Sequence, residues 1–164
     1  PHHTYWGLKD IGQTLLVRRA IEDLLIDTTV CEVPCVRFKS GMPISSRLLS
    51  LDNRSLREVA HVYAAIEVGR RAIASGERRA SIITDMVRHE IESLPLSMFQ
   101  ISYVKLVKPN DFLAPSEVEV PFILHVAITN GKIHHFDGIL IRTDEELHLG
   151  TETLWLDLEW PHST

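Results

Sequence analysis

Apolar residues recur at helical spacing in two consecutive stretches in the middle of the chain. The first stretch, residues 53–75, stops at Gly76, a residue type that commonly ends helices. The second stretch, residues 79–93, ends before Pro95. Both apolar stripes predict helices that face a core rather than a functional surface. In the first helix the stripe consists of Leu56, Val59, Ala60, Tyr63, Ala64 and Ile66.

Three stretches with the composition of β-strands follow these helices: residues 99–107, 118–129 and 132–141. Asn130–Gly131 joins the last two, and this dipeptide is a strong short-range signal for a hairpin. Helices followed by an antiparallel sheet are typical of an α+β unit.

The opening of the chain has the pattern of a small βαβ unit. A short strand ends at Gly7, a helix is predicted from about Asp10 to Leu25, and Thr28–Val33 is a β-branched run that Val36–Phe38 would continue after Pro34. Such a piece of parallel sheet is too small to fold alone. Lys9 lies where the strand passes into the helix, which predicts an anion site, although a single preceding glycine does not make a P-loop.

The turn Ser40–Leu48, read S-G-M-P-I-S-S-R-L, connects the βαβ unit to the helical pair. Gly41 and Pro43 make the turn stiff, since one admits unusual backbone angles and the other fixes its own φ. Two hydroxyls and the Arg47 guanidinium on neighbouring positions suit phosphate oxygens. The alternative is that Ser45 or Ser46 caps a helix and Arg47 is a solvated surface charge.

Charge is distributed unevenly along the chain. Residues 143–164 contain six acids and no Lys or Arg, so subtracting −6 from the net charge of −5 leaves the rest of the chain at +1. Without a basic stripe, nucleic-acid binding is not supported, and the arginine pairs at 18–19, 70–71 and 78–79 are interpreted as solvated helix faces. No apolar run approaches the roughly 20 residues that span a bilayer, so no membrane association is expected. The alternating segment Thr153–Trp160 predicts an edge strand or a docking segment.

Cysteines and histidines do not form a recognisable metal site. Cys31 and Cys35 lack a second ligand pair, and they are interpreted as reduced thiols of a cytoplasmic protein. His134 and His135 are adjacent in a strand pattern, so their side chains are expected on opposite faces. No metal ligand is therefore predicted from the histidines.

Three motifs carry a resemblance to a known family. Trp6–Gln13, W-G-L-K-D-I-G-Q, resembles the F-G-x-K-D-x-Q-Q motif of pantothenate synthetase (pantoate–β-alanine ligase). Ser40–Leu48 is similar to its D-G-L-A-M-S-S-R-N motif, and the stretch from Gly131-Lys132 to Phe136-Asp137-Gly138-Ile139-Leu140 resembles its G-x-x-R-L-I-D-N strand. The order and spacing of all three agree over residues 1–141, which is more specific than any single motif.

The resemblance implies an organisation into a Rossmann-like nucleotidylyl-transferase domain and a small α+β lid domain. We expect residues 1–38 to be the C-terminal remnant of the first, residues 39–142 to be the lid, and residues 143–164 to be an acidic tail. The expected fold class is α+β: the end of a Rossmann-like βαβ unit, then a helical pair and a small antiparallel three-stranded sheet.

The resemblance also implies a reaction: an ATP- and Mg²⁺-dependent ligase condenses pantoate with β-alanine through a pantoyl adenylate. In the first motif, Lys9 would neutralise ATP phosphates and Gly7 would let the nucleotide approach the backbone. Asp10 would meet magnesium or Lys9, and Gln13 would hydrogen-bond pantoate. In the second motif, Ser45, Ser46 and Arg47 would clamp the triphosphate, which makes them catalytic residues together with Lys9. Ile44, where the family has Met, would meet adenine mainly through its backbone.

The chain departs from the family pattern in ways that leave two hypotheses open. Leu8, Gly12 and Leu48 replace an acid, a glutamine and an asparagine, and the P-T-M-G-x-L-H-x-G-H motif of the family's amino-terminal half does not occur. The first hypothesis is a ligase whose other half is a missing N-terminal domain or a partner subunit, with this chain inactive alone. The second is a non-catalytic structural or protein-interaction module derived from the lid. The first residue, Pro1, leads us to expect that the chain begins inside a longer gene product.

Overall fold

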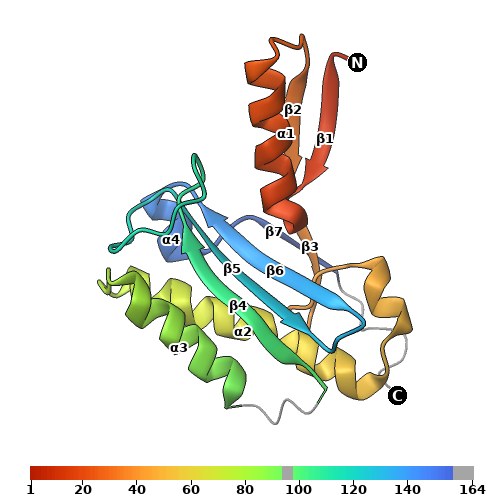
Figure 1. The fold of residues 1–164 in the computed structure, drawn as a ribbon, viewed down its shortest axis with the longest axis vertical. Helices are drawn as coiled ribbons and strands as arrows, with labels where there is room; N and C mark the ends of the chain where they lie inside the picture. Colours follow the sequence, from red (N-terminus) through yellow and green to blue (C-terminus); the bar gives the residue numbers. More distant parts are fainter. Residues whose placement is uncertain (94–97, 157–164) are drawn as a thin grey trace.

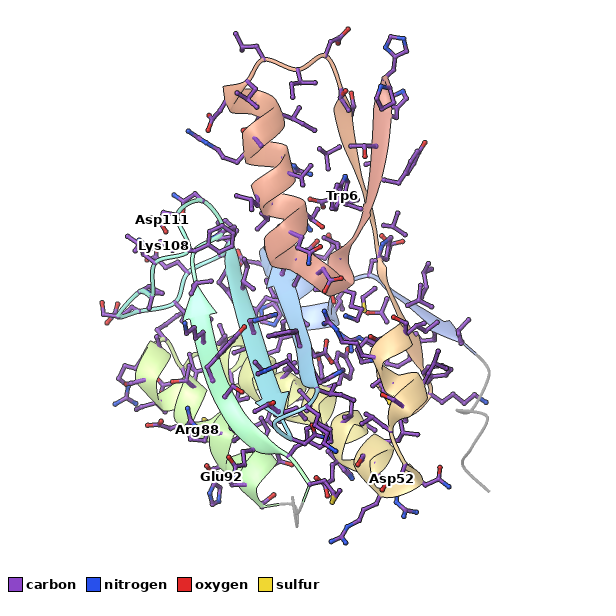
Figure 2. The ribbon with its side chains drawn as sticks, turned by 45° about the vertical axis from the view of Figure 1, so that its right-hand side comes forward. Trp6, Asp52, Arg88, Glu92, Lys108 and Asp111 are labelled. Atoms are coloured by element: carbon purple, nitrogen blue, oxygen red, sulfur yellow. The ribbon has the colours of Figure 1, made fainter. Side chains whose placement is uncertain are left out.

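The computed structural model describes residues 1–93 and 98–156. Figure 1 shows a narrow βαβ unit at the N-terminal end of the chain and a larger unit of helices and sheet, with β3 between them. Figure 2 shows Trp6 within the βαβ unit, whereas Asp52 lies at the start of α2 in the larger unit. The order of a βαβ unit, a helical pair and a small antiparallel sheet agrees with the expected fold class.

The βαβ unit consists of β1 (His3–Gly7), the 3₁₀ turn η1 (Leu8–Asp10), α1 (Ile11–Asp23) and β2 (Thr29–Val33). β1 and β2 pair in parallel, with His3 opposite Thr29 and Gly7 opposite Val33, so the predicted parallel pair is confirmed. The expectation that the next residues prolong β2 is wrong. Pro34 has no N–H to donate to a ladder, and β3 (Cys35–Phe38) instead pairs in parallel with β7 (Thr153–Leu156).

The larger unit is an antiparallel sheet with helices on one face. Its strands follow the order β4 (Gln100–Val107), β5 (Phe122–Thr129) and β6 (His134–Ile141). Two helices, α2 (Asn53–Ala74) and α3 (Ala80–Glu92), cover one face of this sheet, and their apolar stripes form the main core with it. The predicted α+β class is therefore confirmed. None of the helices in the described ranges is long and apolar enough to cross a bilayer.

The strand boundaries differ from the expected ones for backbone reasons. β5 begins at Phe122 rather than at residue 118, because Pro121 cannot donate to the ladder and the Val118 N–H donates to the Arg78 carbonyl (2.7 Å) instead. The β5–β6 hairpin closes through residues 130–133. There the Asn130 side chain accepts from the N–H groups of Lys132 and Ile133, and Gly131 has a φ of +84°.

The segment after β6 contains a helix that the sequence analysis missed, α4 (Asp144–Leu149). The Thr143 hydroxyl accepts from the Glu146 N–H (3.2 Å), and acids occupy the first turn, where they complement the helix dipole. Arg70 corrects a second expectation: it is buried rather than solvated, held by Glu67 while it donates to the Leu147 carbonyl. The expected strand at Thr153–Trp160 is present as β7 over Thr153–Leu156, and its remainder lies outside the described residues.

One buried ion pair connects β3 to the sheet. The Arg37 guanidinium donates to both Asp137 carboxylate oxygens at 2.7 Å, and the two residues are 1% and 0% exposed. Arg37 also donates to the Gly41 carbonyl (2.9 Å) and lies 3.9 Å from the centre of the Tyr63 ring. Burial disfavours the guanidinium charge, but Asp137 more than offsets this and raises the pKa of Arg37.

We expect Asp137→Asn to destabilise the fold by about 3–5 kcal/mol, because it leaves a buried guanidinium charge without a carboxylate. Chemical denaturation monitored by circular dichroism measures this loss. The matched control is Asp23→Asn, which breaks an exposed ion pair to Arg19 at 2.8 Å and should cost less than about 1 kcal/mol. Equal losses in the two variants would contradict the central role of the buried pair.

Because His135 is buried, we expect the free energy of unfolding to fall as the pH is lowered. Burial, the main cause, lowers its pKa to about 4; Asp137 opposes the shift, and Lys9, Arg37 and Arg47 support it. Below pH 6.5 the unfolded chain therefore binds a proton that the folded chain does not. The free energy of unfolding should fall by about 3 kcal/mol between pH 6.5 and 4 on this account, and the contribution is fully retained above pH 6.5.

The control for this prediction is His135→Leu. Leucine is the residue at this position in the G-x-x-R-L-I-D-N motif that the strand resembles. The free energy of unfolding of the two chains, measured by denaturation from pH 8 to pH 4, should diverge as the pH falls. Its slopes against pH should differ by about 1.4 kcal/mol per pH unit. Parallel curves would show that His135 does not carry the effect.

Candidate functional site

The first motif forms a tight turn at the carboxyl end of β1. Gly7 is the last strand residue, η1 carries Lys9 and Asp10, and α1 begins at Ile11. The buried Thr14 hydroxyl lies 3.3 Å from the Gly7 carbonyl and 3.4 Å from the Asp10 carbonyl, and it secures the turn from inside. The turn therefore presents Lys9 on a backbone that the helix holds in place.

Lys9 and Asp10 form an ion pair, with the ammonium 3.4 Å from the carboxylate. The Lys9 side chain is 19% exposed and that of Asp10 is 45% exposed, so this is a partly solvated pair of modest strength. The Asp10 side chain does not cap α1. Its carboxylate is therefore accessible to a ligand or a cation as well as to Lys9.

The second motif follows β3 and is shaped by close backbone contacts. Gly41 has a φ of +86°, and a Cβ there would lie 2.9 Å from Tyr63 Cδ1, so only glycine fits. The Phe38 N–H donates to the Met42 carbonyl, and the Ile44 N–H donates to the Val36 carbonyl. The chain thus folds back along one edge of β3 before it reaches Ser45.

Ser45 has the capping role that the sequence left open. Its hydroxyl accepts from the Arg47 N–H at 3.3 Å, at the start of the 3₁₀ helix η2 (Ser46–Ser50). Ser46 and Arg47 are exposed. The Arg47 guanidinium lies 5.9 Å from the centre of the Phe136 ring, and in the described part of the chain it forms no ion pair. Its charge is therefore directed over the sheet and is open to an anion.

The two motifs come together beside β6. Leu8 and Ile11 pack against Ile123 and Leu140, which joins the first turn to the face of the sheet opposite α2 and α3. Arg47 meets the same strand at Phe136, whose ring centre is 5.9 Å from the guanidinium. Lys9 and Arg47 both contribute to the lowered pKa of His135, of which burial is the larger cause. Two cations from distant parts of the sequence thus flank the same strand, and an anion between them would be attracted to both.

The other residues predicted for the site are Gln13, Ile44 and Gly7. Gln13 is exposed on the first turn of α1, and no contact in the described residues joins it to Ser45 or Arg47. Ile44 is 42% exposed, and its N–H is already donated to Val36, so a backbone contact to a ligand would use its carbonyl. Gly7 is exposed, with open space where a Cβ would be, so its neighbourhood admits a ligand close to the backbone.

The sequence analysis missed an aromatic surface on the sheet. The Tyr103 hydroxyl is 2.9 Å from His125 Nδ1, and the His125 ring stacks with Phe136 at 6.1 Å. Burial lowers the pKa of His125, so the ring is neutral near pH 7. The sequence pattern of β5 could have indicated this surface. Its side chains alternate between the two faces of the sheet, and His125 interrupts the apolar residues on the face away from the helices.

A surface hollow beside Arg47 contains cationic and aromatic side chains. Arg47 lines a surface hollow with Lys132, His134 and Phe136, which places two cationic side chains beside aromatic rings. Residues 1–93 and 98–156 contain no group of three or more His, Cys, Asp or Glu side chains that could hold a metal ion.

Comparison with known proteins identifies the family of the chain. The pantoate-beta-alanine ligase family matches residues 1–140. The pantothenate synthetase of Thermodesulfovibrio yellowstonii is 29% identical over 141 residues, 86% of this chain and 50% of that protein. The enzyme of Pelotomaculum thermopropionicum is 30% identical over the same length, 86% of this chain and 49% of that protein.

Solved structures agree with the sequence comparison. Pantothenate synthetase from Thermus thermophilus has a TM-score of 0.80 and 25% identity, over 87% of this chain and 51% of that one. A Francisella tularensis pantoate-beta-alanine ligase, complexed with beta-gamma ATP and beta-alanine, shares the fold with a TM-score of 0.57 and 19% identity, over 85% and 44% of the two chains. The chain spans about half the length of these relatives. Because the family match covers most of its residues, the chain belongs to the pantoate-beta-alanine ligase family.

Proposed function

We propose that this chain supplies the phosphate-binding part of the site of an ATP-dependent ligase that condenses pantoate with β-alanine. The observation that carries the proposal is that both motifs lie against β6: Leu8 and Ile11, which flank Lys9, pack with Leu140, and the Arg47 guanidinium lies 5.9 Å from the centre of the Phe136 ring. Both motifs resemble those of the family to which the chain belongs. Paired cations over an exposed, partly aromatic face are suited to a nucleotide triphosphate.

The chemistry proceeds in two steps. The carboxylate of pantoate attacks the α-phosphate of ATP, which forms pantoyl adenylate and releases pyrophosphate. The amine of β-alanine then attacks the acyl carbon, forms the amide bond, loses a proton and displaces AMP. Lys9 and Arg47 would stabilise the negative charge that accumulates as pyrophosphate leaves, while the exposed Ser46 hydroxyl and the Ser45 turn contribute hydrogen bonds.

The other predicted residues would position the substrates. Gly7 allows the nucleotide to approach the backbone, and Ile44 would meet adenine through its carbonyl. Gln13, on the exposed first turn of α1, would hydrogen-bond pantoate. When bound with ATP, Mg²⁺ supplies Lewis-acid stabilisation of the phosphates, and Asp10 is the carboxylate of this turn that would contact it.

The complete reaction would need residues from a further N-terminal domain or a partner subunit. Among residues 1–93 and 98–156, β1 pairs with β2 alone, and Tyr5 in β1 is 72% exposed. On α1, Leu16 is 65% exposed, and Leu24 just after the helix is 70% exposed. An incomplete parallel sheet with apolar residues around it is the surface against which the other part would pack.

A non-catalytic structural or interaction module is the alternative function. The replaced motif positions Leu8, Gly12 and Leu48 favour it. Against it, β7, the strand that was the candidate docking segment, is already paired with β3 inside the chain. Nucleotide binding that depends on Lys9 and Arg47 separates the two functions.

We expect calorimetric titration with ATP and Mg²⁺ to detect binding by the whole chain, and Lys9→Ala or Arg47→Ala to weaken it by roughly 10- to 100-fold, since each removes a charge-assisted contact to phosphate. The matched control is Arg19→Ala, which removes an exposed cation from α1 outside both motifs and should leave the affinity unchanged. An absence of binding by the folded chain, or equal affinities in all variants, would favour the non-catalytic module.

The chain alone should show no formation of pantothenate from ATP, pantoate and β-alanine, since half of the relatives' length is not represented in it. A coupled assay for AMP release provides the measurement. Turnover that grows in proportion to the purified chain would show that no further domain or subunit is required.

A further inference from the structure

The segment after β6 lies beyond the residues that match the family, yet it makes specific contacts with α2 and with the linker strand β3. The family match ends at residue 140, while α4 and β7 occupy Asp144–Leu149 and Thr153–Leu156. Figure 1 shows β7 running beside β3, which is the strand that connects the βαβ unit to the larger unit. The contacts of this segment are therefore made at the linker.

β7 occupies the edge of β3 that the turn leaves open. The Phe38 N–H and the Val36 carbonyl bond to the chain segment at Met42–Ile44, which fills one edge. Because successive residues of a strand direct their backbone groups to opposite edges, those of Cys35 and Arg37 face β7. The register confirms the pairing, with Cys35 opposite Thr153 and Phe38 opposite Leu156. β3 is thus bonded along both edges.

A side-chain contact connects β7 to the buried ion pair. The Trp155 ring meets the Tyr63 ring edge-on, with centroids 6.0 Å apart and an interplanar angle of 71°. The Tyr63 ring also contacts the Arg37 guanidinium, which lies 3.9 Å from the ring centre. Tyr63 also packs against Gly41 in the turn that leads to Ser45. Trp155 therefore supports the group that fixes both the ion pair and the turn.

The beginning of the segment is anchored to α2, and the residue just before it contacts the βαβ unit. The Arg70 guanidinium of α2 donates to the carbonyls of Leu147 and His148 at the end of α4, and the Leu147 side chain is buried. Arg142, just before the segment, forms an ion pair with Glu32 of β2, which Arg18 also contacts at 2.6 Å. These contacts hold the segment at one end while β7 pairs at the other.

We propose that residues 143–156 act as a clamp on the linker strand β3, with Trp155 as a positioning residue for Tyr63 and Arg37. The clamp holds the βαβ unit and the larger unit in one relative placement and fixes the turn that carries Ser45–Arg47. The contacts that form it are internal to the chain and require no ligand. The proposal therefore stands independently of the ligase function.

The test is amide hydrogen exchange of the whole chain, followed by nuclear magnetic resonance, in the wild type and in Trp155→Ala. Trp155 is 53% exposed, so the variant is expected to fold. The Arg37 amide, which faces β7, should exchange roughly tenfold faster in the variant, while amides of the central strand β5 keep their wild-type rates. The Tyr63 ring resonances should shift as well, because the neighbouring indole ring is lost.

Two further variants make the test decisive. Trp155→Phe keeps an aromatic ring against Tyr63 and should restore most of the Arg37 protection. A chain that ends at Arg142 removes the clamp entirely and should lose Arg37 protection at least as far as Trp155→Ala does. The proposal is overturned if the Arg37 amide exchanges equally in all chains, or if the β5 amides accelerate by the same factor, which would indicate general destabilisation. Neither readout depends on ATP, so a failure of nucleotide binding is recognised separately.

Discussion

The ion pair between Arg37 and Asp137 is the contact on which the arrangement of the molecule depends. Arg37 belongs to the strand that leaves the βαβ unit, and Asp137 belongs to the last strand of the antiparallel sheet. Two hydrogen bonds of 2.7 Å fix both the distance and the angle between these strands. Because both residues are buried, separating them would leave a charge inside the protein without a partner, which costs a large amount of free energy.

The contacts around this pair extend its effect to the candidate site. The Gly41 carbonyl accepts from Arg37, so the turn that leads to Ser45 and Arg47 is oriented by the same guanidinium. On the sheet, Asp137 accepts from the Gly138 N–H at 2.8 Å, and the same strand carries Phe136 under Arg47. The position of the Arg47 charge relative to Lys9 is therefore determined by packing around β3 rather than by either motif alone.

Much of the fold could be predicted from the sequence because periodicity and turn chemistry act locally. The stripes of α2 and α3, the parallel pair β1–β2 and the hairpin at Asn130–Gly131 are all set by neighbouring residues. The helix α4 was also readable, since Thr143 and Glu146 have capping-box spacing, but the acids around it were interpreted only as a charged tail. The pairing of β3 with β7 was not readable, because it depends on which distant edge remains unfilled.

The candidate site, too, could be predicted from the sequence only where local chemistry determines it. The motifs identified the cationic residues Lys9 and Arg47, and local chemistry explains why Ser45 caps η2. The partners that orient them lie far along the chain. Asp137 and Arg37 each stand within a mostly apolar strand, and only a tertiary structure brings them together. The Tyr103–His125 contact likewise joins two strands whose register no single segment specifies.

In the proposed function, Lys9 of the βαβ unit and Arg47 of the larger unit would bind the same anion. Coulomb attraction to a shared anion increases as the charges approach and as water is excluded, so a triphosphate between Lys9 and Arg47 would favour one separation of the units over others. The contacts at β3 already restrict that separation in the absence of a ligand, through Asp137 on the sheet and Trp155 on Tyr63. Less ordering then remains to be done when a nucleotide binds, which lowers the entropic cost of binding. The acyl adenylate of the proposed reaction would need such an arrangement, because a loosely held pair of units would admit water to the acyl carbon.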